Sequence, residues 1–363
     1  MTHKKLGAVD RISAKKPYGR NECCLNERYS RQKLFTSIGE AGQQKISQKH
    51  VLVIGAGALG TGNAEALVRA GIRKLTIVDR DYVEWSNLQR QQLYSEEDAK
   101  NRIPKAIAAK NRLKMVNSDV EIQALVMDVS VQEMEKLVVD VDLILDATDN
   151  FDTRMLINDI SQKNTIPWIY GACVGSYGIS FTIIPNETPC LNCLLETVPL
   201  GGLTCDTAGI ISPAVQMVVA YQTTEALKIL VEDWGALRKK LVSFDLWKNQ
   251  HTSINVRKVK KEACLSCGIM RTYPYLSYEH QTKTAVLCGR DSVQIRPADV
   301  VERDLEKVAI LLSTQGGKVE QNPFLVSFTI KDYRLVIFKD GRVLIHGTKD
   351  IAEAKTLYHR YLG

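Results

Sequence analysis

The chain has 363 residues, of which 45% are hydrophobic and 25% charged, a globular composition with room for one large and one small domain. It has no apolar run long enough to span a bilayer, and its first residues lack the apolar core of a signal peptide, so we expect a cytoplasmic protein with no membrane partner. The formal charge of +7 does not indicate a nucleic-acid partner: residues 1–24 hold six Lys or Arg against two acidic residues, and the remainder has no evident basic face.

Residues 1–26 are predicted to form a flexible basic arm, because they are charged and carry little hydrophobic content. From Glu27 onward, short apolar strands alternate with helices, which is typical of a parallel sheet in an α/β domain. The expected elements are helices near 39–47, through Ala70 and at 104–116, and strands at 50–54, 74–79, 120–126 and 142–148.

The pattern changes after Pro167. A glycine-rich, strand-like stretch at 168–184 is followed by a core helix at 215–234 and a hairpin at 242–258, so a mixed sheet is expected. Residues 280–363 have their own strand–helix–strand–strand–helix pattern, which predicts a small C-terminal α+β domain. We therefore divide the chain into the arm at 1–26, a main domain at 27–275 and the small domain at 280–363.

The first strand runs into a glycine-rich turn that opens a helix. Gly55, Gly57 and Gly60 have GxGxxG spacing, which lets the backbone turn sharply and approach a phosphate at the helix N-terminus. Asp79 lies 19 residues past Gly60, where a carboxylate can accept hydrogen bonds from ribose hydroxyls. These residues predict a Rossmann-like nucleotide site. Alone they fit a nicotinamide-dependent dehydrogenase equally well, and a turn without a ligand stays open.

A dense polar run follows the ribose-binding position. Asp81, Asn87 and Arg90 lie in this run, and we count all three among the nucleotide-binding candidates. Downstream, Lys105 begins a predicted helix and Asp149 follows a predicted strand. Phosphoryl chemistry builds negative charge on oxygens, so cations and a carboxylate able to hold Mg²⁺ are the groups it requires.

Four of the nine cysteines form two CxxC pairs, Cys190 with Cys193 and Cys264 with Cys267. This spacing lets the two thiolates of a pair meet one tetrahedral ion, and two pairs complete a closed structural zinc site. A redox pair and plain buried thiols are the alternatives. We expect zinc, in a knuckle that ties the loop at 185–200 to the segment at 260–270.

Several linked motifs carry a family resemblance. In chain order they are RYSRQ, GAGALG, DRDYVEWSNLQRQ, IPK, DATDN, the two CxxC pairs and LTCDTAGIISP. Over roughly residues 27–270 the chain resembles the ThiF/MoeB family of sulfur-carrier adenylyltransferases, in the ubiquitin-activating enzyme superfamily, and looks closest to ThiF. The resemblance implies a Rossmann-like adenylation domain that uses ATP and Mg²⁺.

The resemblance also implies roles for the candidate residues. The three glycines would cradle the nucleotide, and Asp79 would hold its ribose. The triphosphate would be contacted by Asn87, Arg90 and Lys105, and Mg²⁺ would be coordinated by Asp149. Arg31 looks like the arginine that reaches into the neighbouring subunit's site, which implies a homodimer.

Three further cysteines lie outside the CxxC pairs and need separate assignments. Cys205 lies in a small-residue loop that resembles the family's crossover loop, so it is either a catalytic thiol for sulfur transfer or a passive loop residue. Cys173 lies in an apolar strand and is expected to be buried and inert. Cys288 in the small domain lacks a glycine-spaced active-site loop, so a carrier-docking or dimer-supporting module is expected there instead of a sulfurtransferase.

The resulting functional hypothesis is ATP-dependent adenylation of the C-terminal glycine of a ubiquitin-like carrier that ends in Gly-Gly. A ThiS-type carrier would place the reaction in thiamine thiazole biosynthesis, and a MoaD-type carrier in molybdenum cofactor biosynthesis. A sulfur-donor protein is a further expected partner. Two hypotheses of another class are a non-catalytic carrier-binding protein and an NAD-dependent oxidoreductase.

Overall fold

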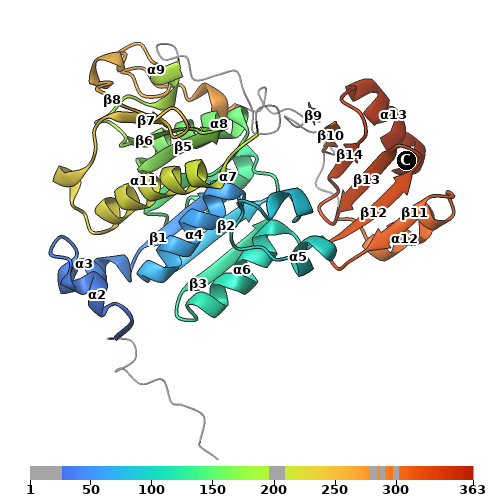
Figure 1. Cartoon of the computed structure of the whole chain (residues 1–363). Helices are drawn as coiled ribbons and strands as arrows, with labels where there is room; N and C mark the ends of the chain where they lie inside the picture. The colour runs from blue at the N-terminus through green and yellow to red at the C-terminus, as the bar shows by residue number, and fades with distance from the viewer. Residues whose placement is uncertain (1–26, 196–208, 278–283, 287–290, 297–301, 363) are drawn as a thin grey trace, which may run out of the picture.

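A computed structural model describes residues 27–195, 209–277, 284–286, 291–296 and 302–362. It contains two β-sheets, each with its own helices and its own buried core (Figure 1). The arm predicted at 1–26 lies outside the described residues. Among the described helices, none combines the length and the apolar character needed to cross a membrane.

The first sheet has eight strands in the order β3-β2-β1-β4-β5-β6-β7-β8. Neighbours from β3 to β5 are parallel and those from β5 to β8 antiparallel, which confirms the predicted mixed sheet. The strands are β1 (His50–Ile54), β2 (Lys74–Asp79), β3 (Glu121–Val126), β4 (Leu143–Asp146), β5 (Trp168–Val174), β6 (Tyr177–Ile183), β7 (Leu241–Asp245) and β8 (Gln250–Ile254). The strand order reverses beside β1, where its neighbours are β2 and β4. Sheets of this kind bind ligands at that point, beyond the carboxyl ends of the strands.

Helices cover both faces of the parallel part of this sheet. Val51 and Val53 pack into one core, and Leu52 and Ile54 pack into the other, so β1 is apolar on both faces. One layer consists of α3 (Gly39–Ile46), α4 (Ala58–Ala70), α6 (Lys105–Val116) and α11 (Ser212–Leu230). The other contains α7 (Val131–Leu137) and α8 (Phe151–Asn164), and the shorter helices are α2 (Ser30–Leu34), α5 (Glu96–Lys100) and α9 (Leu191–Leu195).

Two local signals fix the ends of helices that cover the first sheet. Gly71 ends α4 in the left-handed region at φ +85°, and a Cβ there would lie 2.4 Å from the Tyr29 ring. The side chain of Asn150 accepts hydrogen bonds from the N–H groups of Asp152 and Thr153 and begins α8. The loop after β4 is therefore held between a buried strand and a capped helix.

The second sheet is antiparallel, with the order β11-β12-β13-β14-β10-β9. Its strands are β9 (Thr284–Val286), β10 (Ser292–Ile295), β11 (Lys318–Gln321), β12 (Leu325–Ile330), β13 (Tyr333–Phe338) and β14 (Val343–His346). Two amphipathic helices, α12 (Leu305–Ser313) and α13 (Ile351–Leu362), cover one face of it. The predicted α+β character of this region is confirmed, and we propose that it forms a domain of its own.

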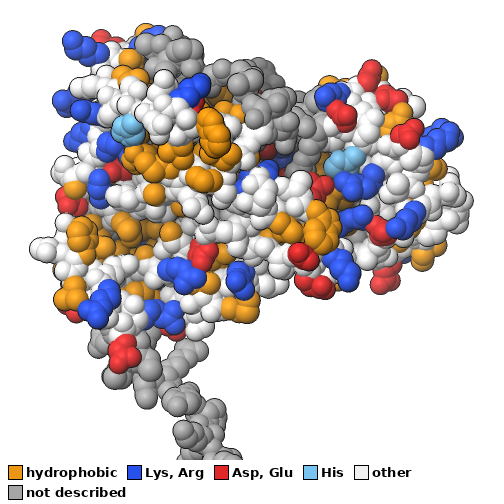
Figure 2. Space-filling model, in the orientation of Figure 1, with side chains coloured by type: hydrophobic (Ala, Val, Ile, Leu, Met, Phe, Trp, Pro, Cys, Tyr) orange, Lys and Arg blue, Asp and Glu red, His pale blue; other side chains and the backbone are white. Residues whose placement is uncertain are grey.

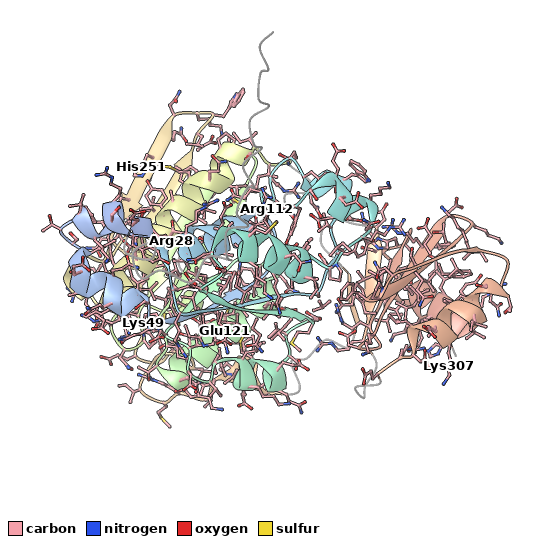
Figure 3. The ribbon with its side chains drawn as sticks, turned by 90° about the horizontal axis from the view of Figure 1, so that it is seen from below. Arg28, Lys49, Arg112, Glu121, His251 and Lys307 are labelled. Atoms are coloured by element: carbon pink, nitrogen blue, oxygen red, sulfur yellow. The ribbon has the colours of Figure 1, made fainter. Side chains whose placement is uncertain are left out.

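We call the first sheet with its helices the first unit, and the second sheet with its helices the second unit. The other face of the second sheet packs against the first unit. Leu325, Val336, Phe338 and Leu344 surround Tyr82, which is 2% exposed. Figure 3 shows Lys307, on α12, on the side of the second unit that faces away from the first. In the second unit, the helices thus cover the outer face of the sheet, and the other face packs against the polar run that follows β2.

Candidate active site

A cavity of about 680 Å³ lies beyond the carboxyl ends of the parallel strands. This volume is in the range of small-molecule sites, and the position is the one that the strand order favours. Its lining comes from the glycine turn after β1, the segments after β2, β3 and β4, and the ends of β5 and β6. The cavity therefore gathers residues that are far apart in the sequence.

The glycines of the turn have different structural roles. Gly55 has φ +98°, and a Cβ there would lie 2.4 Å from the carbonyl oxygen of Ala147. A Cβ at Gly60 would lie 2.0 Å from the carbonyl oxygen of Gly55, so both positions require glycine for packing. Gly57 lines the cavity, and a Cβ there would meet no described atom within 4 Å. The open space at Gly57 fits the close approach of a phosphate to the backbone.

The helix that follows the turn adds to this fit. Gly57 is the N-cap of α4, and no described side chain caps the helix there. The first N–H groups of a helix carry a partial positive charge and bind anions when they are left open. A nucleotide phosphate therefore fits the residues that are present at the turn.

Asp79, at the end of β2, is fixed by the backbone. Its Oδ2 accepts a hydrogen bond of 2.6 Å from the N–H of Ala56, and its Oδ1 accepts one of 2.7 Å from the N–H of Asp81. Burial raises the pKa of Asp79, while Lys105 opposes that change. The carboxylate lines the cavity one strand away from the glycine turn, which is the ribose position that the spacing predicts.

Lys105 is a buried cation in the cavity wall near Asp79 and Asp81. It is 4% exposed, it begins α6, and its Nζ lies 3.2 Å from Oδ2 of Asp81. Both side chains line the cavity. The neighbouring carboxylate favours the charged form of the ammonium group and holds it in place, so Lys105 is positioned to neutralise a phosphate oxygen.

In the polar run after β2, some residues line the cavity and others support the loop that carries them. Arg90 lines the cavity and donates a hydrogen bond of 2.8 Å to the carbonyl oxygen of Ser86. Asn87 is buried at the end of the short 3₁₀ turn Trp85–Asn87, outside the cavity lining, and its Oδ1 accepts a hydrogen bond from the N–H of Glu84. In this structure Asn87 thus shapes the loop that carries Arg90.

Gln91 is a wall residue that the sequence reasoning did not select. It lines the cavity at 4% exposure, and its Oε1 has no hydrogen-bond partner among the described residues. A buried amide oxygen without a partner is costly, so a ligand or water is expected to satisfy it. The sequence signal that could have identified Gln91 is its place directly after Arg90 in the DRDYVEWSNLQRQ motif.

The loop after β4 and the helix that follows it contribute a carboxylate and a cation that the sequence motifs did not single out. Asp149 is exposed and lines the cavity, and its oxygen atoms are ligands of the type that Mg²⁺ prefers. Arg154, one turn into α8, also lines the cavity. Its Nε donates to Oδ2 of the fully buried Asp146 at 3.0 Å, and its Nη2 donates to the carbonyl oxygen of Thr148 at 2.6 Å. Arg154 therefore braces the loop that carries Asp149.

The far end of the cavity lies between β5 and β6. Cys173, expected to be buried and inert, is only partly buried and lines the cavity there. The prediction of burial was wrong because Cys173, although it packs against the core, also faces the cavity. Tyr177, Asp245 and Lys248 complete this end of the cavity.

One further predicted residue does not line the cavity, and two more lie outside the described part of the chain. Arg31 lies in α2, is exposed, and is absent from the lining. Cys205 and Cys288 lie outside the described residues. At the cavity, the structure of one chain therefore brings together Gly55, Gly57, Asp79, Asp81, Arg90, Lys105 and Asp149, while Gly60 supports the turn from behind.

The two CxxC pairs converge. The four Sγ atoms all lie within 4.8 Å of one another, with 3.6 Å between Cys190 and Cys264 and 3.6 Å between Cys193 and Cys267. All four side chains are buried, and hydrogen bonding from Cys190 lowers the pKa of Cys193 to about 2. The donor set and spacing fit a tetrahedral Zn²⁺ with no open position.

The glycine after the second pair has a structural cause. Gly268 follows Cys267, and a Cβ at Gly268 would lie 2.3 Å from the carbonyl oxygen of Glu262. The N–H of Gly268 also donates to the carbonyl oxygen of Cys264 at 2.7 Å. The tight turn that brings the second pair together therefore needs glycine at this position.

Comparison with known proteins places these features in a family. The ThiF family model matches residues 29–266. The sulfur carrier protein ThiS adenylyltransferase of Bacillus subtilis strain 168 is 54% identical over 339 residues, which is 93% of this chain and 100% of that protein. The protein of the same name from Escherichia coli K12 is 36% identical, over 66% of this chain and 94% of its own length.

Two further similarities are more distant. The molybdopterin-synthase adenylyltransferase of Salmonella typhimurium LT2 is 32% identical, over 66% of this chain and 96% of its own length. A crystal structure of E. coli MccB with MccA-N7isoASN has a TM-score of 0.60 at 22% identity, covering 67% of this chain and 74% of that chain. The latter supports the fold of the first unit alone.

Proposed function

The chain belongs to the ThiF family, and from that premise we propose that it is a nucleotidyltransferase which uses ATP to adenylate the C-terminal glycine of a ThiS-type sulfur carrier. The observation that carries the choice of carrier is the 54% identity to the ThiS adenylyltransferase of Bacillus subtilis. The aligned region covers all but 24 of the 363 residues of this chain, so it includes most of the second unit.

The cavity suits the two reactants of this step. The glycine turn and Lys105 would hold the phosphates, Asp79 the ribose, and the end beside Tyr177 would admit the carrier's tail. An oxygen of the carrier's carboxylate attacks the α-phosphorus, the new C–O–P link forms, and the bond to the β-phosphate oxygen breaks. Pyrophosphate leaves with the electron pair.

Charge neutralisation is the main task of the protein in this step. Negative charge builds on the α-phosphoryl oxygens and on the leaving pyrophosphate, so Lys105 and Arg90 stabilise the transition state more than the ground state. No covalent protein nucleophile is needed. Asp149 would hold Mg²⁺, which when bound supplies further charge neutralisation at the phosphates.

We infer that the active form is a homodimer in which Arg31 completes the partner's site. Arg31 is absent from the cavity of its own chain, and its neighbours Leu34 and Phe35 are 71% and 62% exposed. Figure 2 also shows hydrophobic side chains gathered on the face over α11. Exposed apolar side chains of this kind are typical of surfaces that a second chain covers.

We propose two further assignments. A Zn²⁺ held by the cysteine cluster would be structural and would tie α9 to the segment after β8. Cys205 would act after adenylation, in a sulfur-transfer step with a donor protein, and adenylation would not depend on it.

ATP–pyrophosphate exchange with purified carriers tests the proposed function. We expect exchange with a ThiS-type carrier, none with the Asp149→Ala variant, and unchanged exchange with Cys205→Ala. Exchange that occurs only with a MoaD-type carrier would favour the second candidate, which the similarity to the Salmonella protein supports. ATP binding without exchange on any carrier would indicate a non-catalytic protein.

A further inference from the structure

The wall of the cavity beside β2 and β3 is contacted from behind by the second unit. Arg80 follows β2, and Asp128 lies just past β3; both line the cavity. Nη1 of Arg80 lies 3.3 Å from Oδ1 of Asp128, and the two side chains are 16% and 19% exposed. They form an ion pair in the cavity wall, and the sequence reasoning selected neither residue.

Asp128 receives most of its remaining contacts from the second unit. Gln294, in β10, donates from Nε2 to Oδ2 of Asp128 at 2.6 Å. Arg296, just after β10, places Nη2 at 3.0 Å from Oδ2 and at 2.7 Å from the carbonyl oxygen of the same residue. Burial would raise the pKa of Asp128, but Arg80, Arg296 and Arg342 together lower it. The carboxylate therefore stays charged between two arginines from different units.

The backbone on the β2 side is held in the same way. Arg342, in the turn between β13 and β14, is 2% exposed, and its Nη1 donates to the carbonyl oxygen of Arg80 at 3.2 Å. Its Nε is fixed by Oδ2 of Asp340 at 2.6 Å. Two residues further along, Tyr82 is enclosed by apolar side chains of the second sheet. Residues of the second unit thus hold both segments that form this wall, the one after β2 at Arg80 and the one after β3 at Asp128.

The strand order indicates which part of a nucleotide this wall meets. The glycine turn after β1 takes phosphates, and Asp79 at the end of β2 takes the ribose. Because β3 is the next strand beyond β2, the base is expected beside Arg80 and the segment 127–129. A planar guanidinium such as that of Arg80 can lie against an aromatic base.

We propose that the second unit completes the adenine end of the nucleotide site, with Gln294, Arg296 and Arg342 as positioning residues that hold Arg80 and Asp128 against the base. The inference rests on the proposed function, since it requires ATP as the ligand. It assigns the second unit a role within the first unit's reaction.

Kinetics of ATP–pyrophosphate exchange by the full chain test this assignment, with Arg296→Ala as the main variant. We expect the KM for ATP to rise about tenfold, equivalent to ~1.4 kcal/mol. The kcat and the KM for pyrophosphate should stay within about twofold of the unchanged chain, because pyrophosphate has no base. Arg296→Lys, which retains one charged donor, should restore part of the lost affinity.

Arg334→Ala is the matched control. Arg334 lies in the same contact surface with 30% exposure, against 27% for Arg296, and its Nη2 donates to Tyr82 at 2.9 Å and lies 3.4 Å from Glu84. Neither of its partners lines the cavity. We expect the KM for ATP to be nearly unchanged in this variant.

Two results would overturn the proposal: an unaltered KM for ATP in Arg296→Ala, with or without a fall in kcat, or an equal rise of the KM in Arg334→Ala. A melting temperature recorded for each variant identifies unfolding, and Gln294→Leu provides a second variant at the same carboxylate if Arg296→Ala unfolds. Failure of the unchanged chain to exchange with any carrier would overturn the proposed function as well, so the two failures are distinguishable.

Discussion

At the scale of single residues, the site combines positions fixed by packing with positions left open for a ligand. Gly55 and Gly60 cannot carry a side chain, whereas Gly57 can be substituted without a clash. Lys105 and Asp81 form an ion pair inside the cavity instead of on the protein surface. Substitutions at Gly57 and Lys105 should therefore affect activity more than stability.

Gly57→Ala tests the phosphate contact. The added methyl group meets no described atom of the protein but occupies the space that a phosphate would enter, so we expect the KM for ATP to rise about tenfold, or ~1.4 kcal/mol. The melting temperature should change little. Gly235→Ala is the control, because Gly235 lies outside the cavity and its nearest neighbour would be 3.7 Å from the new Cβ. Equal kinetics in the two variants would rule out the predicted phosphate position.

Lys105→Gln tests charge neutralisation. We expect kcat for exchange to fall by about 10²–10³-fold, the usual cost of losing one transition-state contact. Lys74→Gln is the control. Lys74 begins β2, the strand that ends at Asp79, and its Nζ lies 3.0 Å from Oε1 of the surface residue Glu121, which Figure 3 labels. A loss of similar size in both variants would mean that the effect is not specific to the site.

At the scale of elements, how much could be predicted depended on whether a residue stands in a recognisable motif. The glycine turn, Asp79, Lys105 and the cysteine pairs stand in short motifs with characteristic spacing; in the structure the first three lie at the cavity and the four Sγ atoms come together. Arg154 stands in no such motif, and its role follows from hydrogen bonds to Asp146 and Thr148 that only the structure shows. The wall at Arg80 and Asp128 could not be predicted, since Gln294 and Arg296 come from another sheet.

The connection between α9 and the segment after β8 is made by the cysteine cluster. We expect the purified chain to contain one zinc ion and Cys264→Ser to lose it. The melting temperature should fall by about 5 °C or more, since ~1 kcal/mol corresponds to ~2–4 °C in domains of this size. Cys173→Ser should keep the metal. A full complement of zinc in Cys264→Ser, measured by atomic absorption, would contradict the four-sulfur site.

At the scale of the whole molecule, we propose that each complete site takes residues from two chains. Arg31→Ala removes the residue proposed to act in the partner's site, and Asp149→Ala removes one that acts in its own. Each variant alone should be inactive, but a mixed dimer would contain one site with both residues. Mixing the two variants should therefore restore part of the exchange activity. If sedimentation shows mixed dimers and no activity returns, Arg31 acts elsewhere.

The most direct test of the central claim is mass spectrometry of the carrier after incubation with the enzyme and ATP–Mg²⁺. We predict that a ThiS-type carrier gains the mass of one adenylyl group, and that the same carrier without its last glycine gains none. An intact carrier that stays unmodified while ATP is bound, or an equal gain on the shortened carrier, would contradict adenylation of the C-terminal glycine.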